Sequence, residues 1–258
     1  MAGSYEELDF RKTALGELVL RRRHVPGLTD EPIYEIMLGN DLLMSSLLNE
    51  SEIALSNLGI GAIGDGIFDV LVGGLGLGYT AWAALGFERV RSVTVIELLP
   101  EVIEWHRRGM VPLGAELSSN ERCRLLQGDF FVLASDPSVR DLLHPERGYG
   151  AILVDIDHAP DSWLDASSQS FYREGPIARM TGMLQPGGVF ALWAAGKADT
   201  KFETLLTPIF ETVEVHEIEV FNPMIDDDMT DTIYVARKSG SIPVDPPTTR
   251  PPLRKPLR

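Results

Sequence analysis

The chain has 258 residues, of which 44% are hydrophobic, so it can bury a large core and we expect one main domain. Its formal net charge of −15 gives no general attraction to a phosphate backbone, which argues against a nucleic-acid partner. The single cysteine, Cys123, excludes an internal disulfide. The sequence shows neither a secretory leader pattern nor an apolar run long enough to span a bilayer, so we expect a cytoplasmic protein without a membrane partner.

The first part of the chain predicts a small β-unit. Residues 17–25 and 33–45 alternate apolar and polar side chains, and Gly39-Asn40-Asp41 interrupts the second segment as a hairpin turn does. A helical pattern follows and leads into the glycine-rich residues 59–66. We therefore expect residues 1–60 to form a β-hairpin unit and a linking helix.

Strand-like apolar runs then alternate with helical patterns. The predicted strands are 68–73, 93–97, 124–127, 151–155 and 189–193, and the helices that follow them are 80–85, 100–110, 131–143, 171–184 and 200–210. Continuous apolar strands in this order predict a parallel sheet covered on both faces. The last two strands, 211–221 and 232–237, have no helix between them and predict a closing hairpin. We expect an α/β domain over 61–238 and a flexible, proline-rich basic tail over 239–258.

A glycine turn, LVGGLGLGYTA at residues 71–81, joins the first of these strands to its helix. Such a turn lets the backbone approach a ligand closely, and the start of the helix offers unpaired N–H groups. Residues 76–81 fit the GxGxxA form of a dinucleotide fingerprint, whereas residues 74–78 fit the GxGxG form used for S-adenosylmethionine. The candidate contacts are Gly74, Gly76, Leu77 and Gly78, and the turn alone leaves both nucleotide classes open.

Two acids follow at the ends of the next strands. Glu97, with Leu98 beside it, lies about 20 residues past the turn, where a carboxylate can accept hydrogen bonds from both ribose hydroxyls. Gly128-Asp129-Phe130 follows the third strand, and Asp129 is the candidate partner for an adenine edge. LQPGGVFALW at 184–193, followed by a hairpin, is not typical of nicotinamide-binding domains. These motifs favour an S-adenosylmethionine-type site over a nicotinamide-dependent oxidoreductase.

The order and spacing of the motifs resemble the spermidine synthase family, the aminopropyltransferases that share the class I methyltransferase fold. The resemblance runs from about residue 17 to residue 238 and includes the N-terminal β-unit. It rests on VLVGGLGLGYT (70–80), VTVIELLPEVIEWHRR (93–108), GDFF (128–131) and YGAILVDIDHAP (149–160). It implies a Rossmann-like α/β fold with a mainly parallel seven-stranded sheet, an antiparallel last strand, an additional N-terminal β-unit and a homodimer.

Three features depart from the family pattern. Leu77 stands where the family has an aspartate that faces the free ammonium of decarboxylated S-adenosylmethionine. His158 replaces the second acid of the family's DxxD pattern. Met44 and residues 51–55 stand where the family has a glutamine and a tyrosine-histidine-glutamate run, so the usual polyamine clamp is largely missing. Because leucine cannot pair with an ammonium, position 77 favours intact S-adenosylmethionine as the donor.

Candidate catalytic residues follow the fourth strand. Asp155, Asp157 and His158 lie at its carboxyl end, where open α/β sheets place their ligands. A carboxylate or imidazole there can take the proton of an ammonium acceptor. Asp155 ranks first because it aligns with the family's first catalytic aspartate, and its position also makes it a cofactor contact. No metal is expected, because the spacing of these side chains matches no metal motif.

The sequence therefore predicts a spermidine synthase-like transferase that moves an alkyl group from S-adenosylmethionine, or its decarboxylated form, to a small amine acceptor. Methyl transfer is favoured. True aminopropyl transfer, which makes spermidine or a related polyamine, is the alternative, and aminocarboxypropyl transfer is a third reaction. A non-catalytic nucleotide-binding pseudoenzyme is a further alternative, against which Glu97 and Asp155 argue, because a scaffold needs no acid at the catalytic strand end.

Overall fold

The computed structural model describes residues 4–135, 148–156, 159–160 and 169–242. Four N-terminal strands form an antiparallel sheet in chain order: β1 (Ser4–Thr13), β2 (Gly16–His24), β3 (Ile33–Leu38) and β4 (Asp41–Ser45). The sequence predicted β2 to β4 but not β1. None of the β1 residues is buried, so the strand carries no clear alternation of apolar and polar side chains from which it could be recognised.

Seven strands form the main sheet in the order β10-β11-β9-β8-β5-β6-β7. They are β5 (Phe68–Gly73), β6 (Val90–Glu97), β7 (Cys123–Gln127), β8 (Tyr149–Val154), β9 (Leu184–Ala195), β10 (Thr212–Asn222) and β11 (Asp227–Arg237). Strands β5 to β9 run parallel, and β11 pairs antiparallel with both β9 and β10. The predicted fold class, with its mainly parallel sheet, antiparallel last strand and N-terminal β-unit, is confirmed.

The described helices are α1 (Glu50–Gly61), α2 (Tyr79–Leu85), α3 (Pro100–Arg107), α4 (Gly114–Ser119), α5 (Phe130–Ser135), α7 (Glu174–Met180), α8 (Thr200–Leu206) and the 3₁₀ helix η2 (Thr181–Met183). α4 was not predicted, and α3 is shorter than predicted because Gly109, with a φ of +64°, follows its end. The Pro-Gly-Gly segment lies inside β9 rather than before it, and Gly187 there donates its N–H to the carbonyl of Ser239. None of the helices in the described part of the chain has the length and hydropathy of a membrane span.

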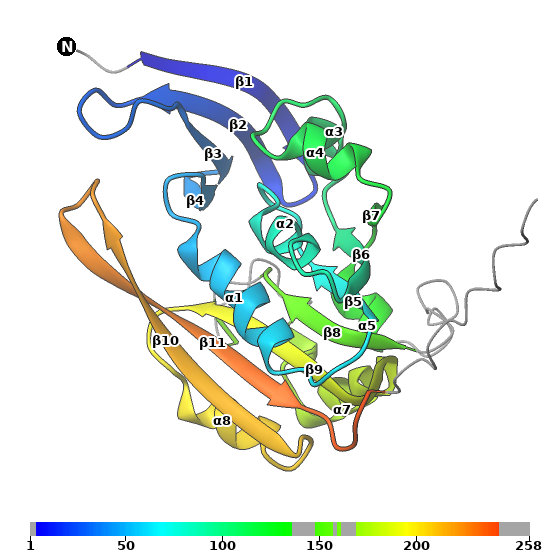
Figure 1. The fold of residues 1–258 in the computed structure, drawn as a ribbon. Helices are drawn as coiled ribbons and strands as arrows, with labels where there is room; N and C mark the ends of the chain where they lie inside the picture. Colours follow the sequence, from blue (N-terminus) through cyan, green and yellow to red (C-terminus); the bar gives the residue numbers. More distant parts are fainter. Residues whose placement is uncertain (1–3, 136–147, 157–158, 161–168, 243–258) are drawn as a thin grey trace, which may run out of the picture.

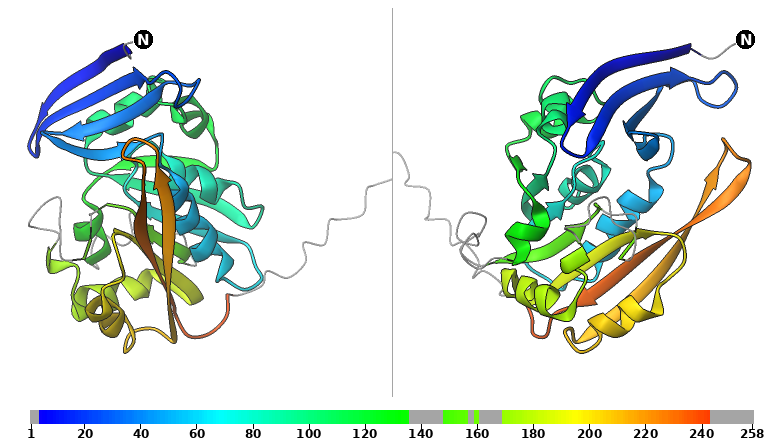
Figure 2. Two further views of the ribbon diagram at one scale, coloured as in Figure 1. Left: turned by 90° about the vertical axis from the view of Figure 1, so that its left-hand side faces the viewer. Right: turned by 180° about the vertical axis from the view of Figure 1, so that it is seen from behind.

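Side chains from the parallel strands enter two apolar cores, one on each face of the main sheet. Val70 and Val72 of β5 pack with residues of α1 to α4, whereas Leu71 between them packs with residues of α5, α7 and α8. This division follows from the alternation of side chains along a strand. Figure 1 and Figure 2 show the small N-terminal sheet at one end of the molecule, with the free end of the β10–β11 hairpin extending toward it.

The chain reverses direction across the main sheet beside β5. From β5 it moves outward through β6 and β7, and it then returns to β8 on the other side of β5. The N–H of Asp155 donates to the carbonyl of Gly73 at 2.9 Å, which joins the carboxyl ends of β8 and β5. Open α/β sheets bind their ligands at such a point.

Candidate active site

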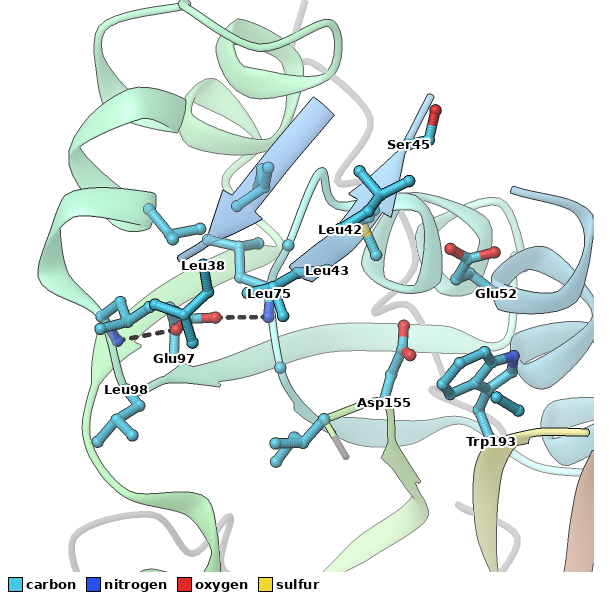
Figure 3. A pocket seen from close by; sticks show the side chains of 18 of the residues that line it. Leu38, Leu42, Leu43, Ser45, Glu52, Leu75, Glu97, Leu98, Asp155 and Trp193 are labelled. Atoms are coloured by element: carbon cyan, nitrogen blue, oxygen red, sulfur yellow. Dashed lines mark hydrogen bonds between the residues drawn. The ribbon is translucent and has the colours of Figure 1, made fainter. Parts of the chain in front are cut away.

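A cavity of about 330 Å³ lies at this edge of the sheet. Aliphatic side chains from the N-terminal unit and from the loops after β5 and β6 make up much of its wall, as in most small-molecule sites. Figure 3 shows Leu38, Leu42 and Leu43 around Leu75, with Glu97 on one side and Asp155 on the other. Glu52 and Trp193 lie beyond Asp155 in the same view (Figure 3). The cavity therefore has an apolar wall and carboxylates on both sides of the glycine turn.

The glycine turn presents bare backbone to the cavity. Gly74 has a φ of +92°, and a Cβ there would lie 1.9 Å from the backbone oxygen of Asp155. Gly76 has a φ of +48°, and a Cβ there would lie 2.6 Å from Sδ of Met44. Only glycine combines these conformations with such close approaches. Both residues line the cavity, and their contact with a nucleotide stays a prediction.

The other two predicted residues of the turn have different positions. The Leu77 side chain is fully buried in the core between the main sheet and α1 to α4, and it is not part of the cavity wall. Its N–H donates to Sδ of Met44 at 2.8 Å. Gly78 precedes α2 with a φ of +97° and also lies outside the wall. Position 77 therefore contacts Met44 of the cavity wall through its backbone N–H, and its side chain does not face the cavity.

Glu97 ties the turn to the end of β6. Its Oε2 accepts the N–H of Leu75 at 2.9 Å, and its Oε1 accepts the N–H of Leu99 at 2.8 Å. Burial raises the pKa of this carboxyl, and the N–H groups of Leu99 and Leu75 oppose that rise. Each carboxylate oxygen accepts one of these two hydrogen bonds, and a carboxylate oxygen has room for two donors. Leu98 is partly exposed and lines the same side of the cavity.

The segment after β7 contributes Asp129 and Phe130 to the wall. Oδ1 of Asp129 accepts the N–H groups of Phe131 at 2.9 Å and Val132 at 3.2 Å, which fixes the carboxylate at the start of α5. Phe130 is buried and occupies the space beside Gly73. Gly128 is not part of the wall, and a Cβ there would lie 2.9 Å from Cδ1 of Leu133.

Asp155 lies at the carboxyl end of β8 and points into the cavity (Figure 3). Its Oδ2 accepts the hydroxyl of Thr80 at 2.6 Å. Burial raises its pKa to about 6, the Thr80 hydrogen bond opposes this rise, and the charge of Asp231 adds to it. The other two predicted catalytic residues, Asp157 and His158, lie outside the described residues.

Two acids that the sequence did not single out, Glu52 and Asp231, complete this side of the cavity. Burial and the charge of Asp155 raise the pKa of Glu52 to about 8. Burial also raises the pKa of Asp231, while hydrogen bonds from Ser51 and Trp193 oppose the rise. Trp193 donates its indole N–H to Oγ of Ser51 at 3.0 Å, and that hydroxyl lies 3.3 Å from Oε2 of Glu52. Three carboxyl groups thus converge on one polar cluster.

The ionisable side chains of the wall are all acidic. Five acidic residues line the cavity, namely Glu52, Glu97, Asp129, Asp155 and Asp231. No lysine, arginine or histidine among the described residues lines it. A low-dielectric pocket with one sign of charge concentrates ligands of the opposite sign. In the described part of the chain, no group of three or more His, Cys, Asp or Glu side chains is arranged to hold a metal ion.

Three features define an α/β protein with a class I methyltransferase-type fold. They are the main sheet, the reversal of the chain's direction beside β5, and the N-terminal β-unit. Among solved structures, the chain is similar to a spermidine synthase in complex with the transition state analogue AdoDATO, with a TM-score of 0.66, 15% identity, and coverage of 90% of this chain and 74% of that one. It is also similar to the spermidine synthase from Thermotoga maritima, with a TM-score of 0.65, 14% identity, and coverage of 90% and 72%. No family model matches the chain. The fold is therefore spermidine synthase-like, as the sequence motifs predicted.

Proposed function

We propose that this protein transfers an aminopropyl group from decarboxylated S-adenosylmethionine to a diamine or polyamine. The observation that carries the proposal is the acidic lining of the cavity, with five acids and no basic side chain among the described residues. Intact S-adenosylmethionine would bring its α-carboxylate among these acids, whereas the decarboxylated donor brings only cationic groups. The spermidine synthase-like fold supports the same reaction class.

The packing and hydrogen bonds of the glycine turn also favour the decarboxylated donor. The sequence had favoured intact S-adenosylmethionine, the donor for methyl transfer. That preference rested on Leu77, and binding the carboxylate of the intact donor would also require free N–H groups in the turn. The Leu77 side chain lies in the core, so its identity does not set the charge that faces a donor. The N–H of Leu75 donates to Glu97, and that of Leu77 donates to Met44. The N–H of Gly78 donates to the Leu75 carbonyl, so these groups already have partners.

Each carboxylate has a distinct role in the proposed complex. Glu97 accepts the ribose hydroxyls, and Asp129 faces the adenine edge with the oxygen that does not cap α5. Asp155 accepts the proton that the attacking ammonium must lose. Glu52 and Asp231 hold the cationic acceptor beside it. Positioning of the two reactants can contribute about 7–11 kcal/mol in favourable cases, and general-base assistance contributes about 10²–10⁴-fold.

The bond changes in this reaction balance without a metal or a redox partner. The amine nitrogen, after giving its proton to Asp155, forms a new C–N bond to the propyl carbon attached to sulfur. The C–S bond breaks at the same time, and its electron pair stays on sulfur. The products are 5′-methylthioadenosine, a neutral thioether, and an amine extended by one aminopropyl group.

The reaction products test the proposal. The protein is incubated with either donor and with putrescine, cadaverine or spermidine, and the nucleoside product is identified by mass spectrometry. We expect 5′-methylthioadenosine together with the extended amine, and only with the decarboxylated donor. Formation of S-adenosylhomocysteine with a methylated amine would overturn the proposal in favour of methyl transfer. The cytoplasmic location, the homodimer and the domain limits 1–60, 61–238 and 239–258 stay predictions.

A further inference from the structure

His106 is a fully buried polar residue on α3 that has no part in the chemistry proposed above. Its Nε2 lies 2.9 Å from the carbonyl oxygen of Gly76. The ring also fills the space beside Gly78, where a Cβ would lie 2.9 Å from Cε1 of His106 and 2.4 Å from Cδ1 of Leu117. The glycine turn therefore packs against the Nε2–Cε1 edge of this imidazole.

The hydrogen bond fixes the proton on the imidazole. A carbonyl oxygen can only accept, so Nε2 of His106 must carry the hydrogen. Nδ1 is buried and has no hydrogen-bond partner within the described residues. A second proton on Nδ1 would create a buried cation with no acceptor, which is costly. Burial accordingly lowers the pKa of His106, and the ring is the neutral Nε2–H tautomer.

The peptide that joins Gly76 to Leu77 is held at both ends. Its carbonyl accepts from His106, and its N–H donates to Sδ of Met44. Gly76 has a φ of +48° and lines the cavity. Glycine crosses between backbone conformations with little steric penalty, so this peptide could rotate if either end were released. A rotated peptide would turn its carbonyl away from α3 and remove the N–H from Met44.

We propose that His106 is a positioning residue for the adenosyl donor. Its Nε2–H keeps the 76–77 peptide oriented toward α3, and so fixes the bare backbone surface of Gly74 to Gly76 against which the donor lies. The neighbouring residue, Leu75, bonds to Glu97, so the ribose carboxylate and the peptide held by His106 belong to one rigid turn. This inference rests on the proposed function, because it concerns the same donor site.

Three variants at position 106 test the inference. In His106→Gln, the amide nitrogen reaches as far as Nε2 and can still donate to Gly76. In His106→Asn, the amide is too short to do so, and His106→Leu has no donor. The probe is 5′-methylthioadenosine, titrated calorimetrically. We expect its affinity to fall about tenfold in the Asn and Leu variants, the scale of one hydrogen bond, and to return to within about threefold of wild type in the Gln variant.

Steady-state kinetics separate positioning from general damage to the fold. We expect the Asn variant to raise KM for the donor about tenfold, while KM for the amine and kcat at saturating donor change by less than twofold. Equal loss of affinity in the Gln and Asn variants, or wild-type affinity in the Asn variant, would overturn the inference. If the Leu variant does not fold, the Gln and Asn pair still gives the comparison.

A Glu97→Ala control distinguishes failure of the inference from failure of the proposed function. If Glu97→Ala abolishes binding of 5′-methylthioadenosine while the His106 variants bind normally, only the inference about His106 is wrong. If the wild-type protein does not bind the nucleoside at all, the proposed function is wrong as well.

Discussion

Replacement of Glu52 by glutamine should stabilise the unliganded protein at high pH. Burial and the charge of Asp155 raise the pKa of Glu52 from 4.5 to about 8 in the folded state. The folded protein therefore holds this proton more tightly than the unfolded chain. Stability that is present below pH 4.5 is lost as the pH rises through 8, because the ionised carboxylate must then stay buried. At about 1.4 kcal/mol per tenfold change in proton affinity, the loss is at most about 5 kcal/mol.

The glutamine side chain keeps the shape of the protonated acid and cannot ionise. Urea unfolding of wild type and Glu52→Gln at pH 5, 7 and 9 measures the difference in the free energy of unfolding. We expect near equality at pH 5 and a gain of about 2–4 kcal/mol for the variant at pH 9. Glu50→Gln, at an exposed acid on the same helix, is the matched control and should show no comparable gain. A gain of equal size at pH 5 and pH 9, or none at pH 9, would refute the assigned burial of Glu52.

Three further substitutions have defined outcomes. Leu77→Asp places an unpaired charge in the core, so thermal unfolding should show that the free energy of unfolding falls by about 3 kcal/mol or more. Donor affinity should not increase, and tighter donor binding would contradict the buried position of that side chain. Gly74→Ala should prevent folding or donor binding because the new Cβ would lie 1.9 Å from a backbone oxygen, whereas Gly61→Ala, where the structure leaves open space, should fold normally by circular dichroism. Asp155→Asn should keep affinity for 5′-methylthioadenosine and lower kcat by about 10²–10⁴-fold, and an unchanged kcat would remove Asp155 from the mechanism.

The sequence predicted the main sheet because its central strands, β5 and β8, are buried on both faces. Strand β8, for example, is a continuous run in which all six residues are buried. It also predicted that Glu97, Asp129 and Asp155 lie close together, because parallel strands bring the ends of separate segments to one edge. The structure places all three in the wall of one cavity.

The other side of the cavity could not be predicted in the same way. Glu52 lies in the first turn of a helix, where an acid is ordinarily explained by the helix dipole. Asp231 lies within β11, one residue before the predicted start of that strand. Nothing in the sequence shows that these two acids meet Asp155, because tertiary packing alone brings the three segments together. Alignment with the family's turn likewise gave the residue type at position 77 but not the burial of its side chain.

The most direct test of the central claim is the ratio of the dissociation constants for the two donors, which differ only by one carboxylate. Calorimetric titration of the wild-type protein at pH 7.5 gives both constants. The acidic wall predicts that decarboxylated S-adenosylmethionine binds at least tenfold more tightly, a difference of about 1.4 kcal/mol. Equal affinities, or tighter binding of intact S-adenosylmethionine, would contradict the selection of a fully cationic donor by this cavity.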